Sequence, residues 1–155
     1  MYISVTPFSL DLVSHIKNIY KNQCDDFRFV DLLLKYLTKF ELFESLVDIL
    51  NQSEDIIRHV IFNITSLSEL NSDFAVTPLE LVVAIHKLEN RIEVKFLTRA
   101  ITICLSQHSV FNQEILALTL QQLVDSSPIP SLTMRTMIQA LGICPRLISF
   151  IMGLL

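Results

Sequence analysis

Residues 77–90 read TPLELVVAIHKLEN, a stretch that joins a complete helix start to a run of apolar residues. Thr77 can cap free backbone N–H groups, Pro78 stands where its missing N–H costs nothing, and Glu80 can reach back to the cap. Leu, Val and Ile then recur at the spacing of a helix face. The stretch therefore predicts a helix over 78–90.

The same periodicity continues through nearly the whole sequence of 155 residues. Polar or proline-containing joints, such as residues 51–53 and 126–130, interrupt it. Only two glycines are present, which leaves little from which to build tight turns between strands. We predict an all-α fold with about nine helices, near residues 8–21, 27–38, 40–51, 54–68, 78–90, 93–107, 113–126, 131–142 and 145–155.

The spacing of these helices indicates how they are arranged. Their starts fall about 14 to 24 residues apart, so a helix pair occupies roughly 35 residues, as in HEAT-like solenoids. The pairs are not alike in sequence, and a closed bundle is the alternative. We predict an irregular HEAT-like stack of helical hairpins that forms a single domain over 1–155.

Composition excludes several classes of protein. The chain is 51% hydrophobic and 18% charged, which excludes a disordered protein. The longest run without a charged residue, 100–113, is shorter than the roughly 20 apolar residues of a membrane span, and no secretory signal is visible. The net charge is −4 and no cluster of Lys or Arg occurs. We therefore expect neither a membrane nor a nucleic acid as direct partner.

No arrangement of residues indicates catalysis or metal binding. The four histidines are scattered, and His86 is interpreted as a partly buried or surface residue rather than a base. Cys24, Cys104 and Cys144 lack the paired spacing of a zinc site and are interpreted as small buried hydrophobic residues. No Gly-rich phosphate loop is present. We therefore expect a protein that is not an enzyme and that needs no cofactor or metal.

Charged residues are concentrated in the first half of the chain. Residues 1–77 hold 17 charged side chains, whereas residues 100–155 hold four. Four charges are too few for a fully solvated surface, which indicates that another protein, or more of the same chain, covers part of this end. The sequence also ends inside the apolar run 147–155. This is expected of a fragment, or of a domain that continues in longer relatives.

Each of the last three predicted helices is apolar over more than one face. On 131–142, one stripe is formed by Met134, Met137, Ile138 and Leu141. One apolar face should pack on neighbouring helices and the other should meet a partner; a central helix covered by its own domain is the alternative. The candidate partner-binding residues lie on and beside these faces: Leu118, Gln121, Arg135, Gln139, Arg146 and Phe150.

Arg135 and Arg146 are the only cationic residues after Arg99. Arg146 follows Pro145 at a predicted helix start, where the helix dipole disfavours a cation, so we expect a compensating acceptor. Each guanidinium can hydrogen-bond a carbonyl or a carboxylate such as Asp125 within the domain, or meet an acidic or carbonyl-rich segment of a partner. We favour the internal role for Arg146 and the partner role for Arg135.

Several segments occur in the order and at the spacing of one known family. They are TPLELVVAIH at 77–86, VFNQEILA at 110–117, LQQLV at 120–124, PIP at 128–130, MRTMIQAL at 134–141 and PRLISFIM at 145–152. By these segments, residues 77–155 resemble the C-terminal domain of symplekin, the scaffold of pre-mRNA 3′-end processing. Residues 1–76 share only their helical character with the family. The basic stretch that typically follows the family's last helix is missing here.

The resemblance implies a non-enzymatic scaffold in the nucleus. Family members hold the C-terminal regions of two metallo-β-lactamase proteins of the cleavage and polyadenylation specificity factor, the 3′-end endonuclease and its inactive paralogue. They also belong to a module shared with the cleavage stimulation factor. We therefore expect a hetero-complex with these proteins. The alternative is a generic α-solenoid adaptor unrelated to RNA processing, which would share the composition but not the run from Met134 to Met152.

Overall fold

The computed structural model describes residues 10–23, 33–70 and 76–155, and every regular element in these ranges is helical. Short loops connect most of the elements. In chain order they are α1 (Leu10–Gln23), the 3₁₀ helix η1 (Leu34–Tyr36), α3 (Lys39–Leu50), α4 (Glu54–Leu70), α5 (Pro78–Lys87), α6 (Val94–Leu105), α7 (Gln113–Val124), α8 (Thr133–Ile143), the 3₁₀ helix η2 (Pro145–Leu147) and α9 (Ile148–Leu154).

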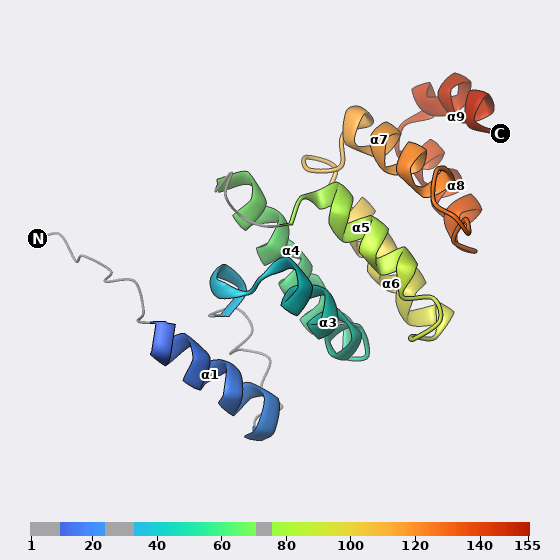
Figure 1. The fold of residues 1–155 in the computed structure, drawn as a ribbon. Helices are drawn as coiled ribbons and strands as arrows, with labels where there is room; N and C mark the ends of the chain where they lie inside the picture. The colour runs from blue at the N-terminus through green and yellow to red at the C-terminus, as the bar shows by residue number, and fades with distance from the viewer. Residues whose placement is uncertain (1–9, 24–32, 71–75) are drawn as a thin grey trace, which may run out of the picture.

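Three helical hairpins, α3–α4, α5–α6 and α7–α8, stack one on the next (Figure 1). The stacking contacts run from α4 to α6, from α6 to α8, and from α5 to α7, so the first and second helices of the hairpins form two layers. The short helix α9 packs on α7 and η2 at the C-terminal end of the stack, while α1 lies outside the stack in Figure 1. The predicted all-α stack of helical hairpins is confirmed.

Side-chain caps fix where several helices begin. At α5 the predicted capping box is present: the Glu80 backbone N–H donates to Thr77 Oγ1 over 3.3 Å, and the Thr77 N–H donates to Glu80 Oε2 over 3.0 Å. The same box occurs before α3, between Thr38 and Glu41. At α7, Asn112 Oδ1 accepts from the Ile115 N–H. These local hydrogen bonds satisfy backbone donors that a helix start otherwise leaves without partners.

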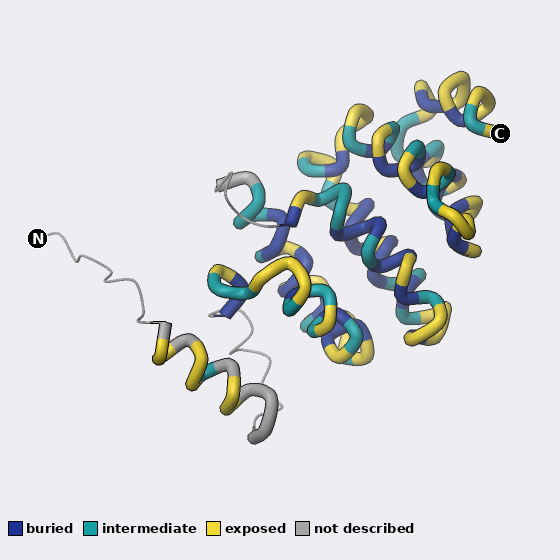
Figure 2. The backbone as a smooth tube through the Cα atoms, in the orientation of Figure 1, coloured by how far each residue is buried: buried dark blue, intermediate teal, exposed yellow. Residues whose placement is uncertain are grey.

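The core runs between the two layers along the whole stack. In Figure 2 the buried parts of the tube lie on the facing sides of the helices, and the exposed parts lie at the turns and on the outer faces. Each hairpin contributes fully buried side chains, among them Leu46, Ile61, Ile85, Leu97 and Leu120. A continuous apolar core of this kind is what a solenoid needs, because no single hairpin can cover its own apolar face.

The observed helices agree with the predicted ones to within a few residues, with two informative differences. Half of the helix predicted at 27–38, residues 27–32, lies outside the described residues, and its described half contains only η1. The helix predicted at 145–155 is divided into η2 and α9. Among the described residues, no helix is both long and apolar enough to cross a membrane.

The cysteine interpretation can be compared with the structure at two of three positions. Cys104 on α6 is fully buried, and burial raises the pKa of its thiol to about 12. Cys144, at the end of α8, is partly buried, and both thiols are free. Cys24 lies outside the described residues. The interpretation as a buried hydrophobic residue is therefore confirmed for Cys104. Cys144 is only partly buried, so the interpretation holds for it only in part.

His86 connects α5 to α8 inside the core, so its interpretation as a partly buried or surface residue was wrong. Its ring is fully buried, with Nδ1 2.8 Å from the Val82 carbonyl oxygen and Nε2 2.8 Å from Thr136 Oγ1. A carbonyl only accepts, so Nδ1 carries the proton, and the neutral ring accepts at Nε2 from the Thr136 hydroxyl. The sequence signal was weak because the partner residue lies 50 positions away.

Burial makes the protein's stability depend on pH through His86. Desolvation lowers the pKa of the imidazole below its ordinary value of 6.5, although Val82 and the nearby Glu89 carboxylate act in the opposite direction. The folded state therefore binds this proton less readily than the unfolded state. The stabilisation is complete above pH 6.5 and is lost as the pH falls through the folded-state pKa, by up to about 1.4 kcal/mol per pH unit.

Urea unfolding at a series of pH values from 7.5 to 5 measures this effect. We expect wild-type stability to fall below about pH 6.5, and His86→Gln to remove that part of the slope, since glutamine does not titrate. The other titrating groups are common to both proteins, so the difference between the two profiles isolates His86. Parallel profiles would contradict the assignment of a neutral buried ring.

Candidate functional site

The last elements of the chain end the stack with an outer face that no other hairpin covers. η2 packs on both α8 and α9, and α7 packs on α8 and α9, so these elements form one compact end (Figure 1). We define the terminal surface as the exposed residues of α8, η2 and α9: Met134, Arg135, Ile138, Gly142, Pro145, Arg146, Ile148, Ser149, Phe150, Met152 and Gly153.

Large apolar side chains are prominent on the terminal surface. Ile138 exposes 68% of its area and Met152 exposes 66%, and Met134, Ile148 and Phe150 are also exposed. Met134 and Ile138 stand one turn apart on the outer side of α8. By contrast, Met137 on the adjoining face of the same helix is buried in the core. Each helix therefore has an inner and an outer apolar face, and the outer one has no cover in the described part of the chain.

The two arginines of this surface are not paired within the described chain. Arg135 and Arg146 are both exposed, and neither side chain makes a hydrogen bond or ion pair with any residue that the structure describes. The acceptor expected for Arg146 is not Asp125, whose two carboxylate oxygens instead accept from Gln121 Nε2 over 3.0 Å. The internal role favoured for Arg146 therefore finds no support, and both guanidinium groups stand free toward solvent.

The structure places the remaining candidates on the neighbouring edges. Leu118 is half-exposed on α7 and shares an outward stripe with Gln121, which is engaged with Asp125. Gln139 is half-buried, and its Nε2 donates a hydrogen bond to Thr102 Oγ1 on α6 over 3.0 Å. Gln139 therefore joins α8 to α6, while Phe150, exposed by 36%, lies at the edge of the α9 face. The six candidates thus gather at one end of the stack, although no hydrogen bond or ion pair joins any two of these described residues.

Both glycines of the terminal surface were missing from the candidates. Gly142 on α8 and Gly153 on α9 are the only glycines of the sequence. Both are exposed, neither has a positive φ, and a Cβ atom added at either position would meet nothing within 4 Å. Glycine inside a helix costs about 1 kcal/mol relative to alanine. The described fold gives no reason for either glycine. The sequence analysis used the rarity of glycine only as an argument against strand turns, and did not connect the two positions with a site.

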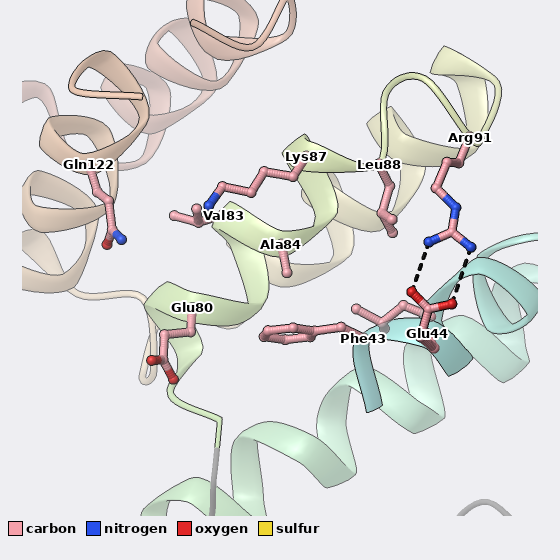
Figure 3. A pocket seen from close by; sticks show the side chains of 10 residues that line it. Phe43, Glu44, Glu80, Val83, Ala84, Lys87, Leu88, Arg91 and Gln122 are labelled. Atoms are coloured by element: carbon pink, nitrogen blue, oxygen red, sulfur yellow. Dashed lines mark hydrogen bonds and ion pairs between the residues drawn. The ribbon is translucent and has the colours of Figure 1, made fainter. Parts of the chain in front are cut away.

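Apart from the terminal surface, a hollow lies between α3 and α5 and is shown in Figure 3. Phe43, Val83 and Ala84 contribute apolar side chains to this α3–α5 groove, whose volume is about 320 Å³. Arg91 donates two hydrogen bonds to Glu44 across it, and this contact lowers the pKa of the Glu44 carboxyl. A further ion pair joins α3 to α5, from Lys39 to Glu80.

These ion pairs distinguish the groove from the terminal surface. In the α3–α5 groove, three of the four charged lining residues have a partner within the chain, and the exception is Lys87. Exposed ion pairs of this kind contribute little stability, but they leave few charges for a ligand to satisfy. At the terminal surface, neither charged group has a partner among the described residues. Its large apolar side chains are exposed, whereas every apolar side chain that lines the groove is buried or half-buried. The terminal surface is therefore the better candidate site.

The family model described as "Symplekin tight junction protein C terminal" matches residues 26–155. The chain belongs to the symplekin C-terminal family. No solved structure matches the chain. The symplekin match begins well before residue 77, so α3 and α4, which offered no family motif to sequence analysis, lie within the matched region. The terminal surface also lies wholly inside it.

Membership of the symplekin family indicates, at a general level, a scaffold role in 3′-end processing. The structure also gives a physical role to two of the segments by which the chain resembled symplekin. His86 ends the first of these segments and Thr136 lies in a later one, and their hydrogen bond joins α5 to α8. Among the described residues, no group of three His, Cys, Asp or Glu side chains could hold a metal ion.

Proposed function

We propose that this chain is a non-enzymatic scaffold subunit of the nuclear machinery that cleaves and polyadenylates the 3′ ends of pre-mRNA. In this role it binds the C-terminal regions of the cleavage endonuclease and of its inactive metallo-β-lactamase paralogue. The cleavage stimulation factor is a further candidate member of the complex. The observation that carries the proposal is the family match over residues 26–155.

The terminal surface supports this proposal on physical grounds. The cores of protein interfaces are enriched in Met, aromatic residues and Arg. Met134, Met152 and Phe150 stand exposed there beside two arginines that have no partner within the described chain. A scaffold acts by holding other proteins in position, and it needs exposed, complementary surface rather than reactive groups. We therefore place the binding of the endonuclease and its paralogue at the terminal surface.

Affinity capture from nuclear extract tests the proposal. The full chain is immobilised, and the captured proteins are identified by mass spectrometry against a resin without bait. We expect the endonuclease and its paralogue to be enriched together, because they bind as a pair. Enrichment of transport or vesicle-coat proteins in their place would support the generic solenoid adaptor and contradict the proposal. Co-expression with the C-terminal regions of the pair then shows whether the contact is direct.

A further inference from the structure

Two residue pairs on the terminal surface repeat the same arrangement. Arg135 lies in the first turn of α8 and Gly142 follows seven residues later; Arg146 lies in η2 and Gly153 follows seven residues later on α9. Seven residues make about two turns of an α-helix, so Arg135 and Gly142 lie close to one line along α8. The second pair repeats the sequence spacing across the junction of η2 and α9. All four residues are exposed.

The described chain gives no internal reason for any of these four residues. Arg135 stands in the first turn of α8, where the helix dipole disfavours a positive charge, and neither Arg135 nor Arg146 has a compensating anion within the described residues. Each glycine is the penultimate residue of its helix, and a Cβ atom added at either one would meet nothing within 4 Å. Residues that conflict with local helix preferences, and that no contact within the chain explains, are expected at functional sites. A partner that supplies an anion and a closely approaching backbone would account for all four.

The charge distribution indicates which kind of partner fits. Residues 126–155 contain two arginines and no Asp or Glu, whereas the whole chain has a net charge of −4. The terminal surface is therefore the positive end of an acidic protein. A second copy that docked by this same surface would bring two more positive charges against it. A membrane-binding helix is typically rich in Lys and Arg on its polar face, and α9 carries neither.

We infer that the terminal surface binds an acidic amphipathic helix of the partner protein. The apolar face of that helix covers Ile138 and its exposed neighbours, while flanking Asp or Glu side chains pair with Arg135 and Arg146. Its backbone approaches most closely at Gly142 and Gly153, where no side chain stands in the way. The inference rests on the proposed function, because it specifies the part of the partner that meets this surface.

Substitution of Gly142 gives a test in which stability and partner binding are expected to change in opposite directions. Gly142→Ala should raise Tm, by at most about 2–4 °C at this position in the last turn of α8, because alanine favours the helix and its Cβ meets nothing in the chain. The same change should weaken binding of the co-expressed C-terminal regions of the endonuclease and its paralogue, and Gly142→Leu should weaken it further. Biolayer interferometry measures the affinities. Higher Tm with unchanged affinity for both variants would overturn the close approach.

The charges are tested on the same complex. Arg135→Glu and Arg146→Glu should each weaken binding at least about tenfold, more at low salt than at high salt. Lys35→Glu, at an exposed cation of η1, is the matched control and should leave the affinity unchanged. Equal effects of all three substitutions would show a general charge effect and overturn the specific pairing.

A probe independent of the proposed partners separates failure of this inference from failure of the proposed function. Two synthetic peptides carry the same leucine stripe at positions i, i+3, i+4 and i+7, flanked by Glu in one and by Lys in the other. We expect the full chain to bind the acidic peptide more tightly, and Gly142→Leu to abolish the preference. No preference, a preference for the basic peptide, tighter binding to anionic lipid vesicles, or self-association through the terminal surface would each overturn the inference.

Discussion

Replacing His86 by alanine should lower the free energy of unfolding by about 3–5 kcal/mol, the range for truncating a large buried side chain. The ring is fully buried and fills space between α5 and α8, so its removal leaves a cavity. It also leaves the Thr136 hydroxyl without its acceptor at Nε2, although that hydroxyl can turn to the Leu132 carbonyl, 3.1 Å away. Since a whole domain is stable by about 5–15 kcal/mol, this single change should remove a large part of the total.

Two variants control this prediction in urea unfolding experiments. His108→Ala truncates an exposed histidine and should change stability by no more than about 0.5 kcal/mol. Thr136→Val keeps the volume but leaves Nε2 without a donor, and should cost about 1–3 kcal/mol. If His86→Ala were as mild as His108→Ala, the junction between the second and third hairpins would not depend on His86.

Ile138→Asp should weaken binding of the endonuclease and its paralogue at least about 100-fold, which corresponds to about 2.7 kcal/mol. The side chain exposes 68% of its area in the free chain, so the substitution should leave the monomer folded and its Tm nearly unchanged. In the complex it would bury a carboxylate within an apolar contact, and that is costly without a paired cation. Isothermal titration calorimetry measures the loss, and circular dichroism checks the fold.

Phe40→Asp is the matched control for this binding prediction. Phe40 on α3 exposes 75% of its area, more than any other large apolar residue whose exposure the structure describes. If binding merely followed exposed hydrophobic area, Phe40→Asp would be the more damaging change. We expect it to leave the affinity intact, because it lies at the other end of the stack from the terminal surface. Loss of binding in Phe40→Asp alone would move the interface to α3.

Most of the helical architecture could be predicted from sequence because its signals are local. Thr77, Pro78 and Glu80 act within four residues of one another, and the predicted cap is present at that place. The split of the last predicted helix into η2 and α9 was harder to foresee. Pro145 begins the 3₁₀ turn η2 there, and α9 starts only at Ile148. Periodicity alone does not distinguish the two helix types over so short a stretch.

The candidate site was only partly predictable because it depends on which helix face turns inward. The apolar stripe of α8 included both Met137 and Ile138, and only the packing against α6 and α7 buries the first and exposes the second. The contact between His86 and Thr136 joins segments far apart in the chain, so no spacing rule reveals it. Spacing likewise did not reveal that Asp125 is engaged by Gln121 rather than by Arg146.

The central claim, that the terminal surface is where this scaffold holds its partners, is tested most directly by hydrogen–deuterium exchange. The full chain is compared free and in complex with the C-terminal regions of the endonuclease and its paralogue. We predict that amides of α8 and α9 gain protection on binding, because a docked partner suppresses local opening there. Amides of α3 and α4 should not change. A complex that forms while protection appears only around the α3–α5 groove, and not in α8 or α9, would contradict the account.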